Sequence, residues 1–531
     1  MKKIDNYQKY IKLLAWAVFA GVLLVLSFFL WRYTRYTLDA DASSELVLAK
    51  HLADQGGSIL SENWYYSTEV KFLNDQLAFE LLFLFTDNWR VVRMGGTLLL
   101  IALMLVSLYY FCRGAGIKKS FPLVGALVLL PLSEPYFKYA LKFAYYIPYI
   151  ITAFVVLGAV MRFPDAKGRK GCAPMVLAAL LSLAAGMLGF RMILILYIPL
   201  AMAALLYLWL NGADASGKKL AAGAGILTGA ALAGCLINQT VIVNSYTFHD
   251  YTTLSFTGFS LDGLERVING LLDILGYRAG EQVFSAALLP SALSGLLFLL
   301  CIYCGGYILL HRDRFSAAQQ LAAYYYFSAI LALCLVYSLT DMDYMSYHSI
   351  PTAIHGLTLP FICFEKGALF GKAGNKVILG LMCFALLCGA LSYNQMRKED
   401  KTGPLREAAR FLAQSEYKNG YASFWIGNLA TELSNGGIDV WVWNDIGLDT
   451  LEDPDRIVPW LQSKEHDQPP EGKVFVLLTA NEAYYCRFSQ NFSEDNVIFR
   501  SANYEPGSPT EYQVYGFDSY AEMRSQFYGQ N

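Results

Sequence analysis

The stretch Arg35-Tyr-Thr-Leu-Asp39-Ala-Asp41-Ala-Ser-Ser-Glu45 decides how this chain is interpreted, because it follows directly on an apolar helix at about 11–31. The next apolar helix begins only near residue 95, so a long loop occupies 32–94. Carboxylates at the end of a membrane span are costly unless they are solvated or used. The two aspartates therefore make this loop the first place to look for chemistry.

The composition is that of an integral membrane protein. Of the 531 residues, 55% are hydrophobic and only 16% are charged, whereas a soluble globular domain carries about 25% charged residues. The mean hydropathy is +0.37. The formal net charge of −2 gives no basic field for nucleic acid, and the abundant Tyr and Phe suit the aromatic belts at membrane interfaces.

Eleven apolar stretches are interpreted as membrane spans, in a polytopic α-helical membrane domain. The first lacks a small-residue cleavage pattern, so we expect it to persist as a span. Those near 121 and 350 are shorter than the roughly 20 residues of a straight span, and we expect them to borrow flanking aromatic residues or to pack inside the bundle. The predicted spans lie at about 12–31, 95–112, 121–133, 146–161, 175–190, 192–210, 220–242, 283–310, 317–340, 350–364 and 376–394.

The charges of the loops predict their sides of the membrane. The N-terminus and every second loop are basic, as cytoplasmic segments are. The other loops (32–94, 134–145, 243–282 and 339–349) and the segment from about Met396 onward are then expected outside. A disulfide-free exterior suits a multi-pass protein of a bacterial plasma membrane. The basic groups are Lys2/Lys3/Lys9/Lys12, Arg113/Lys118/Lys119, Arg162/Lys167/Arg169/Lys170, Lys218/Lys219, His311/Arg312/Arg314 and Lys366/Lys372/Lys376.

The tail reads as a small soluble α/β domain. A helical pattern covers 405–416, and strand-like runs alternate with helical and turn-rich segments, which is typical of a layered α/β module. We therefore expect a membrane domain at 1–395, which includes the loop 32–94, and an extracytoplasmic α/β domain at 396–531. The predicted strands lie at 422–426, 438–443, 473–478, 496–499 and 512–517.

Two helical patterns are predicted inside the first loop. Asp41 opens the first, which ends at the C-cap signal Gly56-Gly57. The second runs through 77–82 to near Trp89, and we expect it to lie along the membrane surface.

This layout resembles that of the GT-C integral membrane glycosyltransferases, the superfamily of the protein O-mannosyltransferases and the lipid A aminoarabinose transferase. There the first long extracytoplasmic loop opens with an acidic residue, often in an Asp-Glu pair, and a helix with an Ala-x-x-Leu rhythm follows. Asp41 falls at that aspartate, and Ala49 and Leu52 keep the rhythm. Ala42 stands in place of the usual glutamate, and Asp39 lies two residues before Asp41.

The resemblance implies a glycosyltransferase that uses a polyprenyl-phosphate-linked sugar, with its active site on the extracytoplasmic face. Asp41 would act as general base or as ligand of a divalent metal, with Asp39 in support. Lys71 lies where relatives carry a lysine that meets the lipid phosphate. The expected partners are the lipid-linked sugar donor, a glycan, lipid or protein acceptor, and membrane lipid.

A leaving phosphate needs cationic or hydrogen-bonding partners. Arg191 lies where two predicted spans meet outside, and a charge there is costly unless it faces a cavity or a partner. His348 lies at the outer start of another span. The remaining candidates outside or at the membrane edge are Glu69, Glu134, Lys138 and Lys142.

Each candidate also has a purely structural interpretation. Asp41 could be the N-cap of its helix, and Lys71 could extend along the interface or pair with Glu69. Arg191 could anchor a span at the interface, and His348 could be an interfacial histidine whose hydrogen bonds are satisfied. The pair Cys301-Ile-Tyr-Cys304 lies mid-span, where packing is the simpler interpretation.

Two other classes of protein compete with an enzyme. A transporter or flippase of a lipid-linked or small substrate would want acidic residues or broken helices at mid-membrane, yet the spans carry almost no charge. A non-catalytic scaffold that displays the C-terminal domain would need neither eleven spans nor a surface helix opened by Asp-x-Asp.

Overall fold

The computed structural model describes residues 2–70, 72–166, 168–249, 255–278, 280, 285, 288–341, 345–368, 373–443, 448 and 451–529. The chain forms two compact units, each built from three separate stretches. The first unit contains Met1–Leu30, Thr97–Ile242 and Thr253–Arg397. The second contains Trp31–Gly96, Val243–Thr252 and Lys398–Asn531, so the first loop clusters with the tail.

The first unit is a bundle of apolar helices. In the described part of the chain, eight helices are long and apolar enough to cross a membrane, by length and composition, which makes the chain a multi-pass membrane protein. Their faces toward the surroundings are apolar: Leu24, Trp209 and Leu310 are 70%, 78% and 83% exposed. The eight helical stretches are Lys12–Tyr36, Trp89–Gly114, Ile147–Asp165, Phe190–Asn211, Ala215–Ser245, Leu288–Leu310, Ala317–Leu339 and Lys376–Met396.

The other three predicted spans are not among these eight, because their apolar helical parts are shorter or broken. The stretch predicted at 175–190 corresponds to α8 (Gly168–Met187). The one near 121 is the eight-residue α5 (Phe121–Val128), and the one near 350 is broken into α16 (Ile350–Gly356) and α17 (Leu359–Glu365). Nearly all of α5 and α16 is buried, so these short segments pack inside the bundle.

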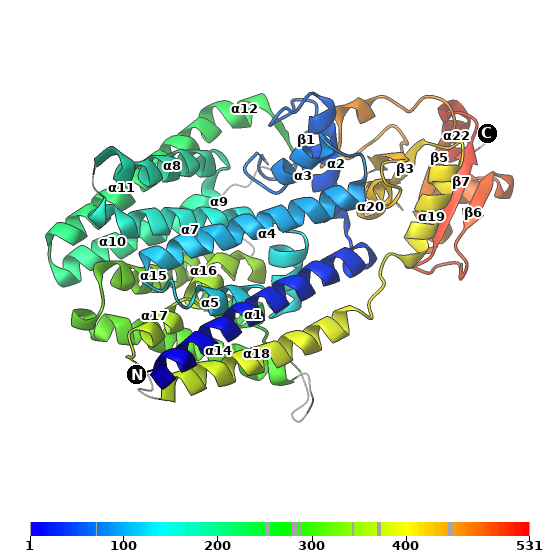
Figure 1. The fold of residues 1–531 in the computed structure, drawn as a ribbon. Helices are drawn as coiled ribbons and strands as arrows, with labels where there is room; N and C mark the ends of the chain where they lie inside the picture. Colours follow the sequence, from blue (N-terminus) through cyan, green and yellow to red (C-terminus); the bar gives the residue numbers. More distant parts are fainter. Residues whose placement is uncertain are drawn as a thin grey trace. The chain divides into compact units, whose positions relative to one another are not determined.

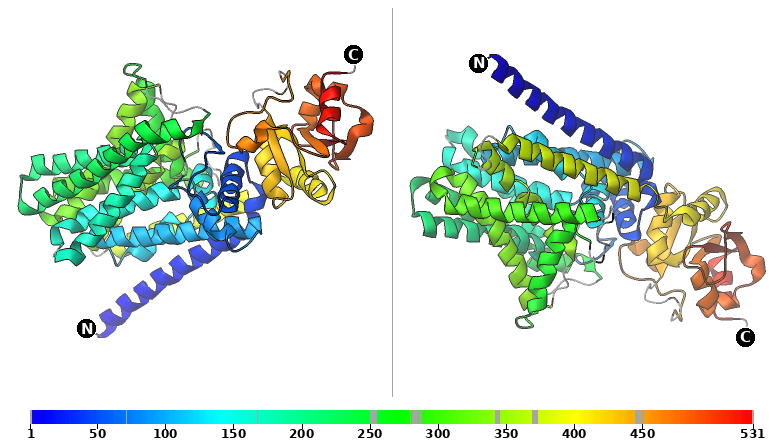
Figure 2. Two further views of the ribbon diagram at one scale, coloured as in Figure 1. Left: turned by 90° about the horizontal axis from the view of Figure 1, so that it is seen from above. Right: turned by 90° about the horizontal axis from the view of Figure 1, so that it is seen from below.

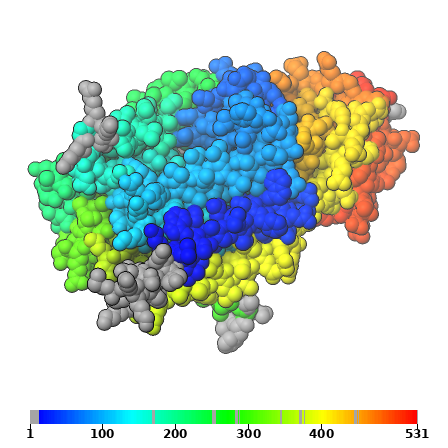
Figure 3. Space-filling model, viewed as in Figure 1, coloured from blue at the N-terminus to red at the C-terminus, as the bar shows by residue number. Residues whose placement is uncertain are grey.

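Neighbouring helices of the bundle can be followed in the figures. In Figures 1 and 2, α8 lies beside α11 and α10 beside α15, whereas α1 (dark blue in Figure 3) lies on the surface. The remaining α-helices are α1 (Lys2–Tyr33), α4 (Trp89–Gly114), α6 (Glu134–Tyr136), α7 (Ile147–Arg162), α9 (Phe190–Met192), α10 (Ile198–Asn211), α11 (Ala215–Ile237), α13 (Leu261–Ile274), α14 (Leu288–Leu310), α15 (Ala317–Leu339) and α18 (Gly374–Met396).

Within the described residues, three π-helical segments interrupt this bundle: η2 (Phe137–Lys142), η4 (Ile193–Tyr197) and η5 (Asn238–Ile242). The 3-10 segment η7 (Ser346–Ser349) precedes α16. π-helical segments often mark functional sites, because the extra residue in their turn changes the direction of the side chains.

The second unit holds a five-stranded mixed sheet in the order β4-β3-β5-β7-β6. β3 pairs in parallel with β4 and β5, and β7 pairs antiparallel with β5 and β6. Figure 1 shows α19 beside β5, β7 and β6. The elements are α19 (Gly403–Gln414), β3 (Asn419–Ser423), α20 (Phe424–Leu433), β4 (Asp439–Trp443), β5 (Val474–Thr479), α21 (Ala480–Tyr485), β6 (Val497–Arg500), β7 (Tyr512–Phe517) and α22 (Tyr520–Phe527).

The strand predicted at 422–426 is only partly correct. β3 ends at Ser423, and Phe424 begins α20 without an intervening loop. The run Phe-Trp-Ile has a high β-propensity, but Phe424 packs as a helical residue against Ala40, Val442 and Val458. Tertiary packing therefore overrides the local preference.

The first loop and the tail fold together in the second unit. α2 (Ala40–Asp54) packs on α20 and on α3 (Gln76–Phe83). The short strand β1 (Tyr65–Tyr66) pairs in parallel with β2 (Thr247–Phe248). Its other edge bonds to the tail, since Tyr65 N–H donates to Gln462 O at 2.9 Å and Leu461 N–H donates to Tyr65 O at 2.7 Å.

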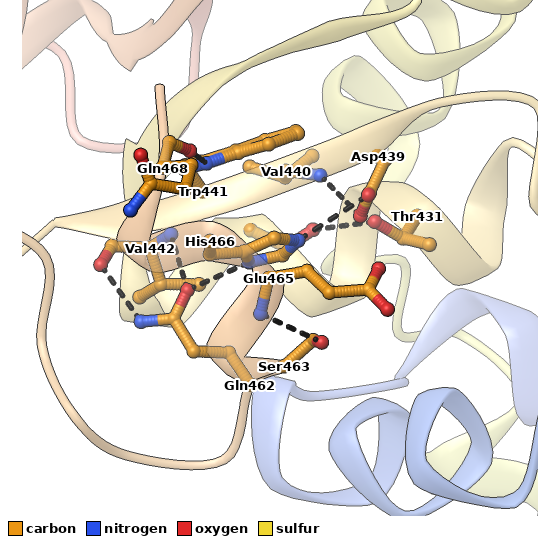
Figure 4. Close-up of polar contacts among 11 residues, drawn as sticks. Thr431, Asp439, Val440, Trp441, Val442, Gln462, Ser463, Glu465, His466 and Gln468 are labelled. Atoms are coloured by element: carbon orange, nitrogen blue, oxygen red, sulfur yellow. Dashed lines mark hydrogen bonds and ion pairs between the residues drawn. The ribbon is translucent and has the colours of Figure 1, made fainter. Parts of the chain in front are cut away.

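A buried polar network fixes that part of the tail on β4 (Figure 4). The Gln462 amide donates to Val442 O at 3.1 Å and accepts from Val442 N–H at 3.0 Å, which sets its orientation. Its oxygen lies 2.9 Å from His466 Nδ1, and His466 Nε2 lies 3.2 Å from Asp439 Oδ2. Both ring nitrogens of His466 thus face oxygen atoms, and its ring stacks on Trp441 with centroids 4.2 Å apart.

Candidate functional site

The two aspartates of the first loop occupy different positions at the start of α2. Asp39 is the N-cap: its backbone is extended, and its Oδ1 accepts from Ala42 N–H at 3.0 Å. Asp41 lies in the first helical turn and is half-exposed. The capping role that the sequence allows for Asp41 therefore belongs to Asp39, and Asp41 lies where the helix dipole favours a carboxylate.

A buried ion pair holds the start of α2. Arg93 of α4 donates through Nε to one carboxylate oxygen of Glu432 in α20, and through Nη2 to the other at 2.7 Å. The same Nη2 donates to the carbonyl of Ala42 at 2.8 Å. Arg93 is 3% and Glu432 8% exposed. This bidentate pair joins three helices next to Asp41.

Sequence reasoning missed Arg93 and Glu432. One signal was available: Arg93 lies at the start of an apolar run, where a charge is costly unless it has a partner. Its partner could not be found in the same way, because Glu432 lies in the tail, outside every predicted membrane span.

The other predicted loop residues are less defined. Glu69 is buried, and Lys71 lies outside the described residues. Glu45 follows Asp41 by one helical turn and is also buried, so two carboxylates share one side of α2. The proposed contact between Lys71 and a lipid phosphate stays a prediction.

In the first unit, Arg191 and His348 line one cavity. It has about 400 Å³ of empty space, part of which is open to solvent. Tyr146 and Tyr337 line it together with apolar residues of α15 and η4. The fold thus brings together two residues that the sequence suggested separately.

Local backbone geometry positions Arg191. Gly189 has φ 110° and ψ −155°, a conformation that only glycine adopts readily. It breaks the helix before α9, and the π-helical η4 follows α9 directly. The Arg191 guanidinium lies 6.0 Å from the ring centroid of Tyr149.

His348 is held as a neutral imidazole. Met345 N–H points to His348 Nδ1 at 3.4 Å, so this nitrogen accepts. The Tyr337 hydroxyl, 2.7 Å from the same nitrogen, is then the donor, and the ring proton belongs on Nε2. Burial, and then the charge of Arg191, lowers the pKa of His348 to about 3.

Tyrosines and lysines surround this region of the first unit. The ring of Tyr347 lies 4.4 Å from that of Tyr139 and 5.6 Å from that of Tyr146, between centroids. Lys138 and the buried Lys142 belong to the π-helical η2. Phenolic hydroxyls and cations are the donors that a phosphate or a sugar requires.

Glu134 does not line the cavity. It is exposed and begins α6, whose N-cap is Ser133. Its negative charge acts on Asp273 of α13. Burial, and then the charge of Glu134, raises the pKa of the Asp273 carboxyl group, whereas a hydrogen bond from Ser346 lowers it.

The donor set does not fit a metal held by the protein alone. Within the described ranges, no group of three or more His, Cys, Asp or Glu residues could hold a metal ion.

The comparisons with known proteins gave matches among solved structures. No protein-family model and no curated protein matches the sequence. Two crystal structures of ArnT from Cupriavidus metallidurans, apo and bound to undecaprenyl phosphate, are each 11% identical to the chain with a TM-score of 0.59. Each match covers 94% of this chain and 97% of ArnT.

The archaeal oligosaccharyltransferase AglB from Archaeoglobus fulgidus, in complex with an inhibitory peptide and a dolichol-phosphate, also matches. Its TM-score is 0.47 at 11% identity, over 89% of this chain and 70% of AglB. The likeness to ArnT extends over nearly the whole of both chains. This chain therefore has the fold of ArnT, as the resemblance of its first loop predicted.

Proposed function

We propose that this protein is a membrane glycosyltransferase that takes its sugar from a polyprenyl-phosphate carrier at the extracytoplasmic face. The observation that carries the proposal is the cavity shared by Arg191 and a neutral His348, in a fold whose solved counterpart ArnT binds undecaprenyl phosphate. Fold likeness alone would not suffice, because one fold can serve several functions.

Arg191 would bind the phosphate of the donor. A guanidinium offers a planar pair of N–H donors that fits two phosphate oxygens, and it stays charged at any physiological pH. His348, with its proton on Nε2, would add a neutral donor. Together they would stabilise the negative charge that grows on the leaving phosphate as the sugar departs.

Asp41 would act as the general base. Its carboxylate would accept the proton of the acceptor hydroxyl as that oxygen attacks the anomeric carbon and the bond to the phosphate breaks, with inversion. Arg93 would be a positioning residue, since its contact with the Ala42 carbonyl fixes the turn that carries Asp41. Asp39 would support the same turn as N-cap.

The test compares Asp41→Asn with Asp39→Asn in purified protein supplied with polyprenyl-phosphate sugars. We expect Asp41→Asn to fold but to lose about 10²–10⁴ of its transfer rate, the usual contribution of a general base. Asp39→Asn keeps its rate, because asparagine caps a helix as well as aspartate does.

Two outcomes would contradict the proposal. If both variants transfer sugar at the wild-type rate, neither carboxylate is the base. If the wild type moves labelled lipid-linked sugar across vesicle membranes without transferring it, the protein is a flippase.

A further inference from the structure

Three arginines gather where the first two membrane spans end, within the second unit. Arg32 and Arg35 lie at the end of the first span, and Arg90 lies at the start of the second. These two ends are joined by the loop, so they lie on the same face of the membrane. The charges of Arg35 and Arg32 both act on Arg90, which means that three like charges are held near one another.

Aromatic rings hold two of these guanidinium groups in place. Arg90 lies 4.6 Å from the centroid of the Trp31 ring and donates to Trp31 O at 2.8 Å. Arg35 lies 4.9 Å from the centroid of the Tyr36 ring and donates to its hydroxyl at 2.9 Å. Stacking orients the guanidinium plane without using all of its donors.

No carboxylate neutralises the three arginines in the part of the chain that the structure describes. The nearby Asp400 is engaged by Arg406, with both oxygens bonded at 2.8 and 2.7 Å. Arg35 Nε is buried and has no hydrogen-bond partner among the described residues. The three positive charges therefore repel one another, and the Nε–H donor of Arg35 is unused. A bound anion would offset the repulsion and accept that hydrogen bond.

Helix capping explains only one of these contacts. A cation near the C-terminus of a helix is favourable, and Arg90 fills that role for α1. Arg312 does the same for α10, since it donates to the carbonyl of Leu210. Capping does not explain why three arginines share one helix end.

We propose that Arg32, Arg35 and Arg90 bind the phosphate group of an anionic membrane lipid beside Trp31. The ends of two spans lie at the depth of the lipid headgroups, and Trp31 is 47% exposed, as in interfacial belts. Arginine forks match phosphate oxygens two at a time. This site shares no residue with the Arg191 cavity and does not depend on the proposed function.

The experiment is native mass spectrometry of the full chain, released from nanodiscs that contain phosphatidylglycerol or phosphatidylcholine. We expect retained phosphatidylglycerol adducts, and a fall of at least about tenfold in Arg32→Gln/Arg90→Gln, since the loss of even one charge-assisted hydrogen bond accounts for that factor. The matched control is Arg312→Gln/Arg314→Gln, which removes one half-buried and one exposed arginine together with one helix-end contact and should retain the lipid.

Further arms identify the source of the phosphate. Excess glycerol phosphate should leave the lipid bound, because the acyl chains add affinity, whereas full displacement would overturn the lipid assignment. Equal loss in the control, or equal retention of phosphatidylcholine, would overturn the site. If the glutamine variant fails to fold, Arg32→Lys/Arg90→Lys keeps the charge but loses the fork, and unchanged retention in it would also overturn the proposal.

Discussion

The two regions that carry the candidate chemistry are built in opposite ways. In the first unit, the candidate cations and His348 lie on short segments: Lys138 and Lys142 on η2, Arg191 on the three-residue α9, and His348 on η7. In the second unit, carboxylates lie on a regular helix that Asp39 caps and the Arg93–Glu432 pair locks. The difference suits the two proposed roles, since several adaptable donors can bind a lipid phosphate, whereas a general base depends on one fixed geometry.

Their surroundings differ in the same sense. The helices of the first unit present apolar side chains outward, so their stability depends on lipid. The sheet of the second unit buries its aromatic core, including Trp443, Phe488 and Phe527, as a water-soluble domain does. Variants in the two units should therefore fail in different ways, and four experiments test that expectation.

The largest effect should come from Arg93→Met. It leaves Glu432 buried without its cation, and removing one partner of a buried ion pair costs about 3–5 kcal/mol. We expect the second unit to lose hydrogen-exchange protection while the helices of the first unit keep theirs. The double variant Arg93→Met/Glu432→Leu removes both charges and should recover most of the stability. Uniform loss of protection in both units would contradict the expectation that variants of the two units fail in different ways.

Arg191→Gln should lower function rather than stability. We expect the KM for the lipid-linked donor to rise by about 10–100-fold, since a charge-assisted hydrogen bond contributes about 1.5–3 kcal/mol. Arg191→Lys should recover only part of this, because lysine binds phosphate as a point charge. Thermal unfolding should be unchanged in both. A loss of stability without a change in KM would make Arg191 a structural anchor.

The stability of the folded protein should depend on pH through His348. Its pKa in the folded protein is about 3, below the roughly 6.5 of an unfolded histidine. The unfolded chain therefore binds more protons between these values, and the folded state loses stability as the pH falls below about 6.5. His348→Gln should lose less stability than the wild type between pH 6.5 and 4.5 in thermal unfolding. An identical pH dependence in the two proteins would show that His348 does not stay neutral in the fold.

The smallest effect should come from the cap of α2. Asp39→Ala should cost about 1 kcal/mol, whereas Asp39→Asn should cost almost nothing. Denaturant unfolding of the second unit measures both. A large loss of sugar transfer in Asp39→Asn with unchanged stability would assign the general base to Asp39 instead of Asp41.

Local signals predicted much of the fold. Hydrophobic length identified the membrane helices, including the short ones near 121 and 350 that pack inside the bundle. Alternating β-rich runs predicted the α/β character of the tail, whose strands lie within a few residues of their predicted positions except near Phe424. Each of these signals lies within about twenty neighbouring residues, so it can be recognised without knowledge of the rest of the chain.

The candidate sites depend on contacts that local signals do not predict. The sequence identified Asp41, Arg191 and His348 one by one as candidates, each from a charged or titratable side chain at the membrane edge. Only the tertiary structure gave Arg191 and His348 one cavity, and only it assigned the cap to Asp39. It alone paired Arg93 with Glu432 and joined β1 to residues 461 and 462 of the tail. The partners in these last two contacts lie more than 300 residues apart. No local pattern encodes them, because burial and hydrogen bonding select a partner only after the chain has folded.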